Sequence, residues 1–264
     1  IYSIIAHEMA HQYWGHQVVG ANVEGATMLS ESFAEYSSLM VMKNELKDDS
    51  KMKQFLTYDF EKYLRGRSNE TQIESPLYKV KDQGYIHYGK GSLVLYALQD
   101  YIGEEEVNEA LKEFLNVYKY KEAPYPTTLD FIRYLTPKIP TKYQYLLTDW
   151  FKEITLYDYR IENSSYTTLG NGKYLVDISI TASKMKVDSL GAENQVKPYN
   201  WVEINLYSEN EKQLLISNRV LINKEKMDFS FEVNSIPSKA VIDPKRLLIE
   251  RIITDNVKTI NHIK

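Results

Sequence analysis

The chain of 264 residues contains no cysteine, which removes one class of stabilising and metal-binding chemistry. Disulfide bonds and thiolate-bound zinc sites are therefore excluded. The chain also lacks any apolar run approaching the roughly 18 residues that a membrane-spanning helix requires. The absence of cysteine leaves the redox compartment open, because many proteins of either kind of compartment have none.

A large excess of charge of one sign is also missing. The 32 basic and 36 acidic residues give a net charge of −4, and the pI is about 5.8. This balance favours neither nucleic acid nor an anionic membrane surface, so we expect no nucleic-acid partner. A hydrophobic content of 43% and a charged content of 26% are typical of globular proteins, and the length is sufficient for two modest domains.

What the chain does contain, close to its first residue, is the pentapeptide His7-Glu8-Met9-Ala10-His11. Residues four apart on a helix lie on the same face, so His7 and His11 can direct two imidazoles at one metal ion. Glu8 would lie beside that metal, where it can take a proton from a water molecule. The flanking segments, residues 1–6 and Tyr13-Trp14, are apolar and predict a buried helix whose polar ligands face a cleft.

A catalytic zinc needs a third protein ligand. In metzincins a glycine and a third histidine follow at fixed positions, but Trp14 and Gln17 occupy them here, and His16 is one residue short. Glu24 follows too closely and is predicted to lie in a connecting turn. Glu31 is the next acidic residue and belongs to a predicted second helix, so we expect it to bind the metal.

Glu35 lies four residues after Glu31 and therefore on the same helical face. We expect it to accept a hydrogen bond from the far ring nitrogen of a ligand histidine. Such carboxylates fix the tautomer and the orientation of the imidazole. The alternative is an ordinary solvated or capping glutamate.

The residues His7, Glu8, His11, Trp14-Gly15 and Glu31 together resemble peptidase family M1, the zinc aminopeptidases of the gluzincin clan. The family pattern places 18 residues between the second histidine and the glutamate, whereas 19 intervene here, which implies a one-residue insertion in the loop around residues 20–27. The segment Tyr88-Gly89-Lys90-Gly91 resembles the Tyr-x-Lys-Gly segment of the same family. This resemblance implies that Tyr88 donates a hydrogen bond to the oxyanion of the tetrahedral intermediate.

The resemblance covers residues 1–155 well and the remainder loosely. The family motif Gly-x-Met-Glu-Asn, which holds the free amine of a substrate, precedes H-E-x-x-H, but this chain begins six residues before His7. We therefore expect the chain to be the C-terminal part of a longer protein, with upstream domains of the same polypeptide as partners, and to be weakly active or inactive by itself. The closest pattern resembles M1-type domains fused to permease-like proteins of bacterial ABC transporters, which implies a membrane permease region outside this soluble piece. The localisation of the protein stays open.

The rest of the chain predicts an α + β multidomain fold. Apolar stripes predict further helices around residues 52–60, after Tyr88, over 104–120, after Thr127 or Thr128, and over 143–154. Short alternating strands follow, with a hairpin turn at Gly170-Asn171-Gly172. We expect a helical zinc-peptidase domain at residues 1–158 and an immunoglobulin-like antiparallel β-sandwich at residues 159–264.

The sequence therefore predicts a zinc metallopeptidase that acts on peptide substrates, with His7, His11 and Glu31 as ligands, Glu8 as general base and Tyr88 as oxyanion donor. Two alternatives stay open. One is a catalytically silent zinc-binding module of a membrane transporter assembly, which loss of Glu8 or Tyr88 would have favoured. The other is an endopeptidase of the same clan, which the same metal site would serve.

Overall fold

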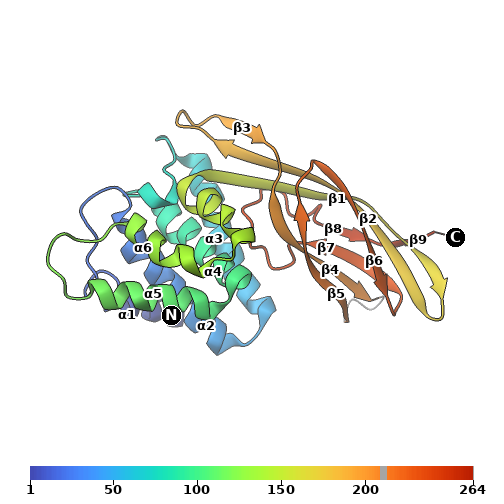
Figure 1. The fold of residues 1–264 in the computed structure, drawn as a ribbon, viewed down its shortest axis with the longest axis horizontal. Coiled ribbons are helices and arrows are strands. Elements are labelled where there is room, and N and C mark those ends of the chain that lie inside the picture. The colour runs from blue at the N-terminus through green and yellow to red at the C-terminus, as the bar shows by residue number, and fades with distance from the viewer. Residues whose placement is uncertain (209–212, 264) are drawn as a thin grey trace. The chain divides into compact units, whose positions relative to one another are not determined.

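The computed structural model describes residues 1–208 and 213–263 and divides the chain into two compact units. The first unit comprises residues 1–154 and 187–192, and the second comprises residues 155–186 and 193–264. The first is helical and the second consists of strands (Figure 1). In the described part of the chain, no helix is both long enough and apolar enough to cross a membrane.

The first helix, α1 (Tyr2–Ala10), carries the two-histidine motif and is followed by His11 at its C-cap. The prediction that this helix is buried is wrong, because the side chains of Ile1, Ile4 and Met9 are 91%, 64% and 65% exposed. The helix packs on α2 (Phe33–Leu46) through its other face, where the Ser38 hydroxyl donates to the Ser3 carbonyl at 2.8 Å. The apolar stripe therefore faces away from α2, which among the described elements is the one that α1 contacts extensively.

The remaining α-helices agree in position with the apolar stripes of the sequence. They are α3 (Asp49–Asn69), α4 (Gly91–Ile102), α5 (Glu104–Tyr118) and α6 (Thr128–Leu135). Asp48 caps α3 by accepting from two backbone N–H groups. Thr127 and Asp130 form a reciprocal capping box at α6, which satisfies N–H groups that a helix end leaves without partners.

Three short segments are π-helical turns: η1 (Met28–Ser32), η3 (Tyr85–Lys90) and η6 (Leu147–Lys152). The prediction of one regular helix over residues 143–154 is corrected here. This part of the chain forms a 3₁₀ turn, η5 (Thr141–Tyr143), followed by the π turn η6. Two further 3₁₀ turns are η2 (Leu77–Lys79) and η4 (Thr136–Lys138). A π turn holds one residue more than an α turn and is enriched at functional sites. Glu31 lies in η1 and Tyr88 lies in η3.

Aromatic side chains hold the helical unit together behind α2. The Phe33 ring contacts the Phe131 ring of α6 with centroids 4.6 Å apart, and Phe131 contacts Phe114 of α5 at 5.6 Å. All three side chains are fully buried, and their rings meet edge to face, which is the favoured geometry of aromatic pairs. This cluster fixes the start of α2, two residues after Glu31.

The β unit contains two sheets. The first has the order β3-β2-β1-β9 with β6 paired to β2, and the second has the order β5-β4-β7-β8. The strands are β1 (Ile154–Gly170), β2 (Lys173–Val187), β3 (Glu193–Val196), β4 (Asn200–Ser208), β5 (Leu214–Ile222), β6 (Lys226–Val233), β7 (Pro237–Ile242), β8 (Val257–Thr259) and β9 (Asn261–His262).

The predicted hairpin is confirmed, since β1 and β2 are neighbours joined at Asn171-Gly172, both of which have positive φ angles of 52° and 75°. The sandwich is not wholly antiparallel, because β9 runs parallel to β1. The chain passes from β8 in one sheet to β9 in the other through the single residue Ile260. The antiparallel description of this domain therefore holds for the other described pairs, β2·β6, β4·β5, β4·β7 and β7·β8.

Candidate metal centre and catalytic cleft

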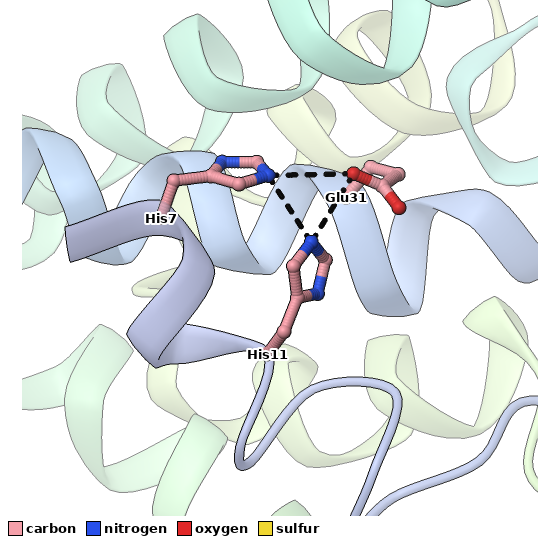
Figure 2. A group of neighbouring side chains, drawn as sticks. All are labelled: His7, His11 and Glu31. Atoms are coloured by element: carbon pink, nitrogen blue, oxygen red, sulfur yellow. Dashed lines mark hydrogen bonds and ion pairs between the residues drawn. The ribbon is translucent and has the colours of Figure 1, made fainter. Parts of the chain in front are cut away.

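Three side chains that were selected from the sequence converge in the structure. Nε2 of His7 lies 3.1 Å from Nε2 of His11, and Oε2 of Glu31 lies 3.5 Å from each of those nitrogens. Figure 2 shows the two imidazoles and the carboxylate directed at one another, from α1, from its C-cap residue and from η1. Their ligand atoms form a triangle that a single ion can occupy.

The size of this triangle fits zinc. Four ligands at about 2.0 Å in tetrahedral geometry lie about 3.3 Å from each other. The observed separations of 3.1 to 3.5 Å bracket that value. The three side chains are 12%, 20% and 23% exposed, so each is partly accessible to solvent, which suits a catalytic site that must admit water.

The second nitrogen of His11 is held by the backbone. Nδ1 lies 2.9 Å from the Trp14 carbonyl oxygen, and a carbonyl can only accept, so the ring proton sits on Nδ1. This tautomer leaves the lone pair of Nε2 free for the metal. Trp14 itself is buried against Phe33, with ring centroids 5.0 Å apart, which explains why a tryptophan follows the motif.

The second nitrogen of His7 faces Glu35. Nδ1 lies 2.6 Å from Oε2 of Glu35, but the ring N–H is not aligned with that oxygen, so the contact is a close ion pair and not a linear hydrogen bond. The carboxylates of Glu31 and Glu35 raise the pKa of His7 to about 9, and His7 in turn lowers the pKa of Glu31. Negative charge is therefore gathered around the imidazoles, in an environment that suits a cation.

Glu8 and Tyr88 face the same small pocket beside the triangle. This pocket of about 270 Å³ is lined by Ser3, Ile4, His7, Glu8, Glu35, Lys62 and Tyr88. The Tyr88 ring lies 5.9 Å from the His7 ring. Burial and the Glu31 carboxylate raise the pKa of Tyr88 to about 12, so its hydroxyl keeps its proton and can donate it to a hydrogen bond at neutral pH.

Sequence reasoning missed Lys62, which belongs to α3. Its ammonium group lies 4.8 Å from the centroid of the Tyr88 ring, over the ring face. Lys62 stands among several lysines and arginines of a mostly polar helix, so nothing in the local sequence distinguishes it. Glu24, by contrast, is not brought to the site and lies near Lys79, with Nζ 3.6 Å from Oε2 of Glu24.

Buried hydrogen bonds fix the position of Tyr88. The Ser32 hydroxyl donates to the His87 carbonyl at 2.7 Å and thereby ties η1 to η3. The Ser92 hydroxyl lies 2.8 Å from the Tyr88 carbonyl. A Cβ atom on Gly91 would lie 2.1 Å from the Ser32 hydroxyl oxygen, so only glycine fits there. The glycine that ends the Tyr-x-Lys-Gly segment is thus a packing requirement.

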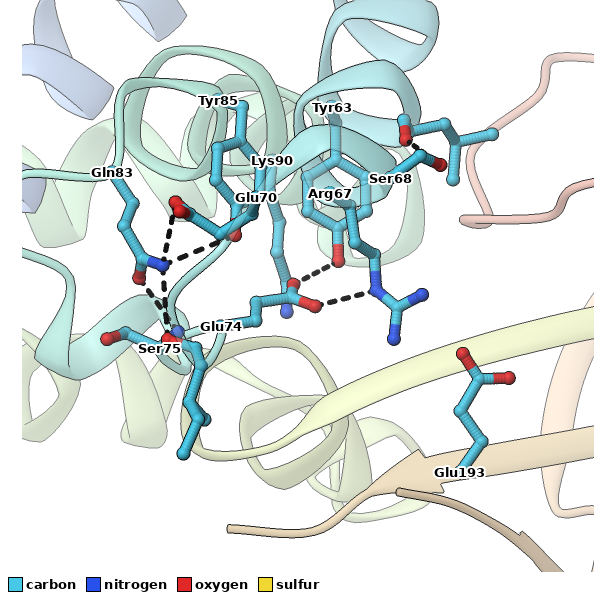
Figure 3. A network of polar contacts seen from close by, with 12 residues as sticks. Tyr63, Arg67, Ser68, Glu70, Glu74, Ser75, Gln83, Tyr85, Lys90 and Glu193 are labelled. Atoms are coloured by element: carbon cyan, nitrogen blue, oxygen red, sulfur yellow. Dashed lines mark hydrogen bonds and ion pairs between the residues drawn. The ribbon is translucent and has the colours of Figure 1, made fainter. Parts of the chain in front are cut away.

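A polar network supports η3 from the side of α3 (Figure 3). The Tyr63 hydroxyl and the Nε–H of Arg67 both donate to Glu74, the latter at 2.6 Å. Lys90 is 1% exposed, and its ammonium group donates to the Glu153 carbonyl at 3.4 Å. Burial lowers the pKa of Lys90. Lys90 does not line the pocket beside the histidines, so it acts within the protein interior.

Comparison with known proteins places the chain in a family. The Peptidase family M1 domain matches residues 1–150, so the chain belongs to peptidase family M1. It is 25% identical over 206 residues to Probable aminopeptidase 2 of Sulfurisphaera tokodaii, covering 71% of this chain and 26% of that protein. It is 30% identical over 127 residues to Tricorn protease-interacting factor F2 of Thermoplasma acidophilum, covering 45% and 16%.

The fold comparison agrees with this assignment. Legionella pneumophila aminopeptidase A, solved in complex with aspartic acid, matches 95% of this chain and 27% of its own chain with a TM-score of 0.53. Its sequence identity of 13% shows a shared fold alone. The chain thus spans about a quarter of the length of Probable aminopeptidase 2 and of this structural neighbour, and less of the tricorn-interacting factor.

Proposed function

We propose that this chain holds the zinc site and catalytic residues of a metallopeptidase of the aminopeptidase type. The observation that supports this most directly is the triangle of His7, His11 and Glu31 atoms, whose edges of 3.1 to 3.5 Å suit one tetrahedral zinc ion. Membership of family M1 and the names of the relatives agree with it. Aminopeptidases act on peptides, so the substrate class is a peptide.

His7, His11 and Glu31 would hold the zinc, and Glu35 would orient the His7 ring from 2.6 Å. When bound, zinc supplies a Lewis acid that polarises the scissile carbonyl and makes the attacking water more acidic. Glu8 takes the proton from that water and passes it to the leaving amine, because it lines the pocket without being a ligand. Tyr88 donates a hydrogen bond to the oxygen on which negative charge develops.

The silent-module alternative has less support. Such a module has no need of a base beside the metal or of a tyrosine donor opposite it, yet Glu8 and Tyr88 both line the pocket. The endopeptidase alternative differs only in how the substrate is held. The names of the relatives favour an aminopeptidase over an endopeptidase. The catalytic assignment of residues 1–158, the immunoglobulin-like assignment of residues 159–264 and the association with a permease region stay predictions.

Zinc content tests the ligand set. The chain should bind one zinc per molecule, and His7→Ala and Glu31→Ala should each lose it, because two remaining ligands hold zinc weakly. Metal analysis after dialysis against a weak chelator gives the stoichiometry. Glu45→Gln on the same helix as Glu35, with an exposed side chain, is the matched control and should keep its zinc. Stoichiometric zinc in Glu31→Ala would remove Glu31 from the site.

Glu8→Gln separates binding from chemistry. The variant should keep zinc and lose hydrolysis of aminoacyl and peptide reporters by at least about 100-fold, since it removes the base and leaves the ligands. Turnover is compared with that of wild type and Glu45→Gln at equal zinc content. Turnover at the wild-type level in Glu8→Gln would refute the general-base role. A zinc-loaded wild type that shows no turnover even together with the upstream domains of the same polypeptide would favour the silent module.

A further inference from the structure

A second pocket opens beside the catalytic one. It has a volume of about 330 Å³, and the two pockets share Ser3 and Glu35 in their walls. Volumes near 300 Å³ and above are typical of small-molecule sites. Since Glu35 also contacts His7, the second pocket begins at the edge of the metal centre.

The walls of this pocket are apolar for most of their length. Leu39 and Met42 come from α2, and Phe55 comes from α3. Glu35 and Leu39 are four residues apart on α2, and Phe55 and Asp59 are four residues apart on α3. The two residues of each pair therefore lie on the same face of their helix. The pocket therefore combines apolar side chains with one acidic residue from each helix.

Asp59 is the unusual member of this lining, because its side chain is only 4% exposed. Its one hydrogen-bonding neighbour in the described chain is the Ser92 hydroxyl, at 3.5 Å. That hydroxyl lies much closer to the Tyr88 carbonyl, at 2.8 Å, and has a single proton to donate. The Asp59 carboxylate is therefore close to unsatisfied, which is costly for a buried acid.

The charges around Asp59 do not neutralise it. Burial is the main cause that raises its pKa to about 7, the Glu35 carboxylate raises it further, and Lys62 opposes both. The Lys62 ammonium lies over the Tyr88 ring, and within the described residues no basic group is within ion-pairing distance of Asp59. A cation that entered the pocket would meet two carboxylates and no bound counterion.

We propose that this pocket receives an arginine or lysine side chain of a peptide substrate, with its cationic end at Asp59 and its methylene groups along Leu39, Met42 and Phe55. The inference deepens the proposed peptidase function and rests on it. Basic side chains lay their methylene stems along apolar surfaces and pair their heads with carboxylates. Glu35 contacts His7 and lines both pockets, so a long side chain next to the cleaved bond can pass along this shared wall into the second pocket.

Matched peptides test the preference. We compare kcat/KM of the zinc-loaded chain for alanine-based peptides that carry either arginine or norleucine at one position next to the cleaved bond. At one of the tested positions, kcat/KM should be about 10- to 100-fold higher for the arginine peptide than for the norleucine peptide, as a charge-assisted hydrogen bond gives. Asp59→Asn should abolish most of that ratio. Glu61→Gln, an exposed acid on the same helix, should keep the ratio. Equal ratios in wild type and Asp59→Asn would overturn the proposal while leaving the peptidase function intact.

A second measurement does not need turnover. The Met42 methyl group, labelled with ¹³C, lines the pocket and should shift in the NMR spectrum when n-butylguanidinium is added, but not with n-butanol. The other methionine methyl groups serve as internal controls. Asp59→Asn should weaken the guanidinium response at least tenfold in apparent Kd. A Met42 signal that ignores guanidinium, or responds equally to butanol, would refute the cation site whether or not the chain is a peptidase.

Discussion

The imidazole of His7 meets a different group at each of its two nitrogens. Nε2 faces His11 and Glu31, and Nδ1 faces Glu35. One ring thus joins the metal triangle to the wall shared by the two pockets. At the scale of single residues, this explains why Glu35 matters although it does not point into the triangle.

Replacing Glu35 by glutamine should therefore weaken the site without destroying it. The amide removes the negative charge beside Nδ1 and loosens the orientation of the ring, which typically costs about 10- to 100-fold in metal affinity. Competition with a zinc-sensitive fluorescent chelator gives the Kd of wild type, Glu35→Gln and the exposed control Glu45→Gln. A Glu35→Gln affinity equal to that of the control would show that His7 needs no such partner.

Glu250 in the β unit is a second residue whose environment has a measurable consequence. It is buried, and Oε2 accepts from Asn256 at 2.6 Å. Burial raises its pKa from 4.5 to about 9. Between pH 4.5 and 9 the folded chain keeps a proton that the unfolded chain releases, so stability falls as the pH rises, by at most about 1.4 kcal/mol per pH unit.

Glu250→Gln should flatten this dependence, because glutamine cannot ionise. Urea unfolding of the β-strand signal, followed at pH 5 and pH 8, should show a larger loss for wild type than for the variant. The exposed Glu225→Gln variant should behave as wild type. A wild-type midpoint that does not change between these pH values would contradict the raised pKa.

At the scale of elements, the two π-helical turns are the parts that deliver Glu31 and Tyr88. They meet where the Ser32 hydroxyl donates to the His87 carbonyl and where Gly91 leaves room for Ser32. The extra residue between His11 and Glu31 was predicted to lie in the loop. The π turn at η1 is another place where one added residue can be accommodated, since it widens the helix by one residue.

This contact predicts a compensating pair of substitutions. Gly91→Ala should cost about 1–3 kcal/mol, because its Cβ would lie 2.1 Å from the Ser32 oxygen. Combining it with Ser32→Gly removes the clash, after which the nearest remaining atom is Cδ1 of Leu77 at 3.5 Å. The free energy of unfolding should therefore recover in the double variant.

Gly84→Ala is the matched control, because its Cβ would meet nothing closer than 3.8 Å. Chemical unfolding of wild type, Gly91→Ala, Ser32→Gly and the double variant gives the coupling free energy. Additive losses in the double variant would mean that the two turns do not touch as the structure has them.

At the scale of the whole molecule, every residue of the proposed site belongs to the helical unit. His7, Glu8 and His11 come with α1, Glu31 and Glu35 with η1 and α2, and Tyr88 with η3. The β unit contributes none of the residues that line the described catalytic pocket. A bound metal should therefore stabilise one unit directly and leave the other as it is.

Hydrogen exchange measures this difference. Added zinc should slow exchange in α1, η1 and α2, because binding to the folded form alone stabilises it by about 2.7 kcal/mol at 100 times the Kd. Exchange in β4 and β5 should not change. Protection spread equally over both units would show that the metal couples them, and His7→Ala should remove whatever protection zinc gives.

Sequence alone determined the local part of this protein. Histidines four apart must share a helical face, Thr127 or Thr128 can cap the helix that follows, and Asn171-Gly172 forms a hairpin turn. Each of these follows from the geometry of one helix or one turn, so no distant residue could change it. The ligands and the base were predicted from the spacing of the motif and the second helix, whereas the role of Tyr88 was implied by the resemblance to the family.

Tertiary packing decided the rest. The apolar stripe of α1 faces outward because Ser3 and His7, not the isoleucines, lie against α2. Lys62 and Asp59 join the site only because α3 lies beside η3 and α2. Periodicity reports which residues share a face of one element, but which face meets which neighbour depends on contacts between segments far apart in the chain. The second pocket exists only through such contacts, and no motif encodes it.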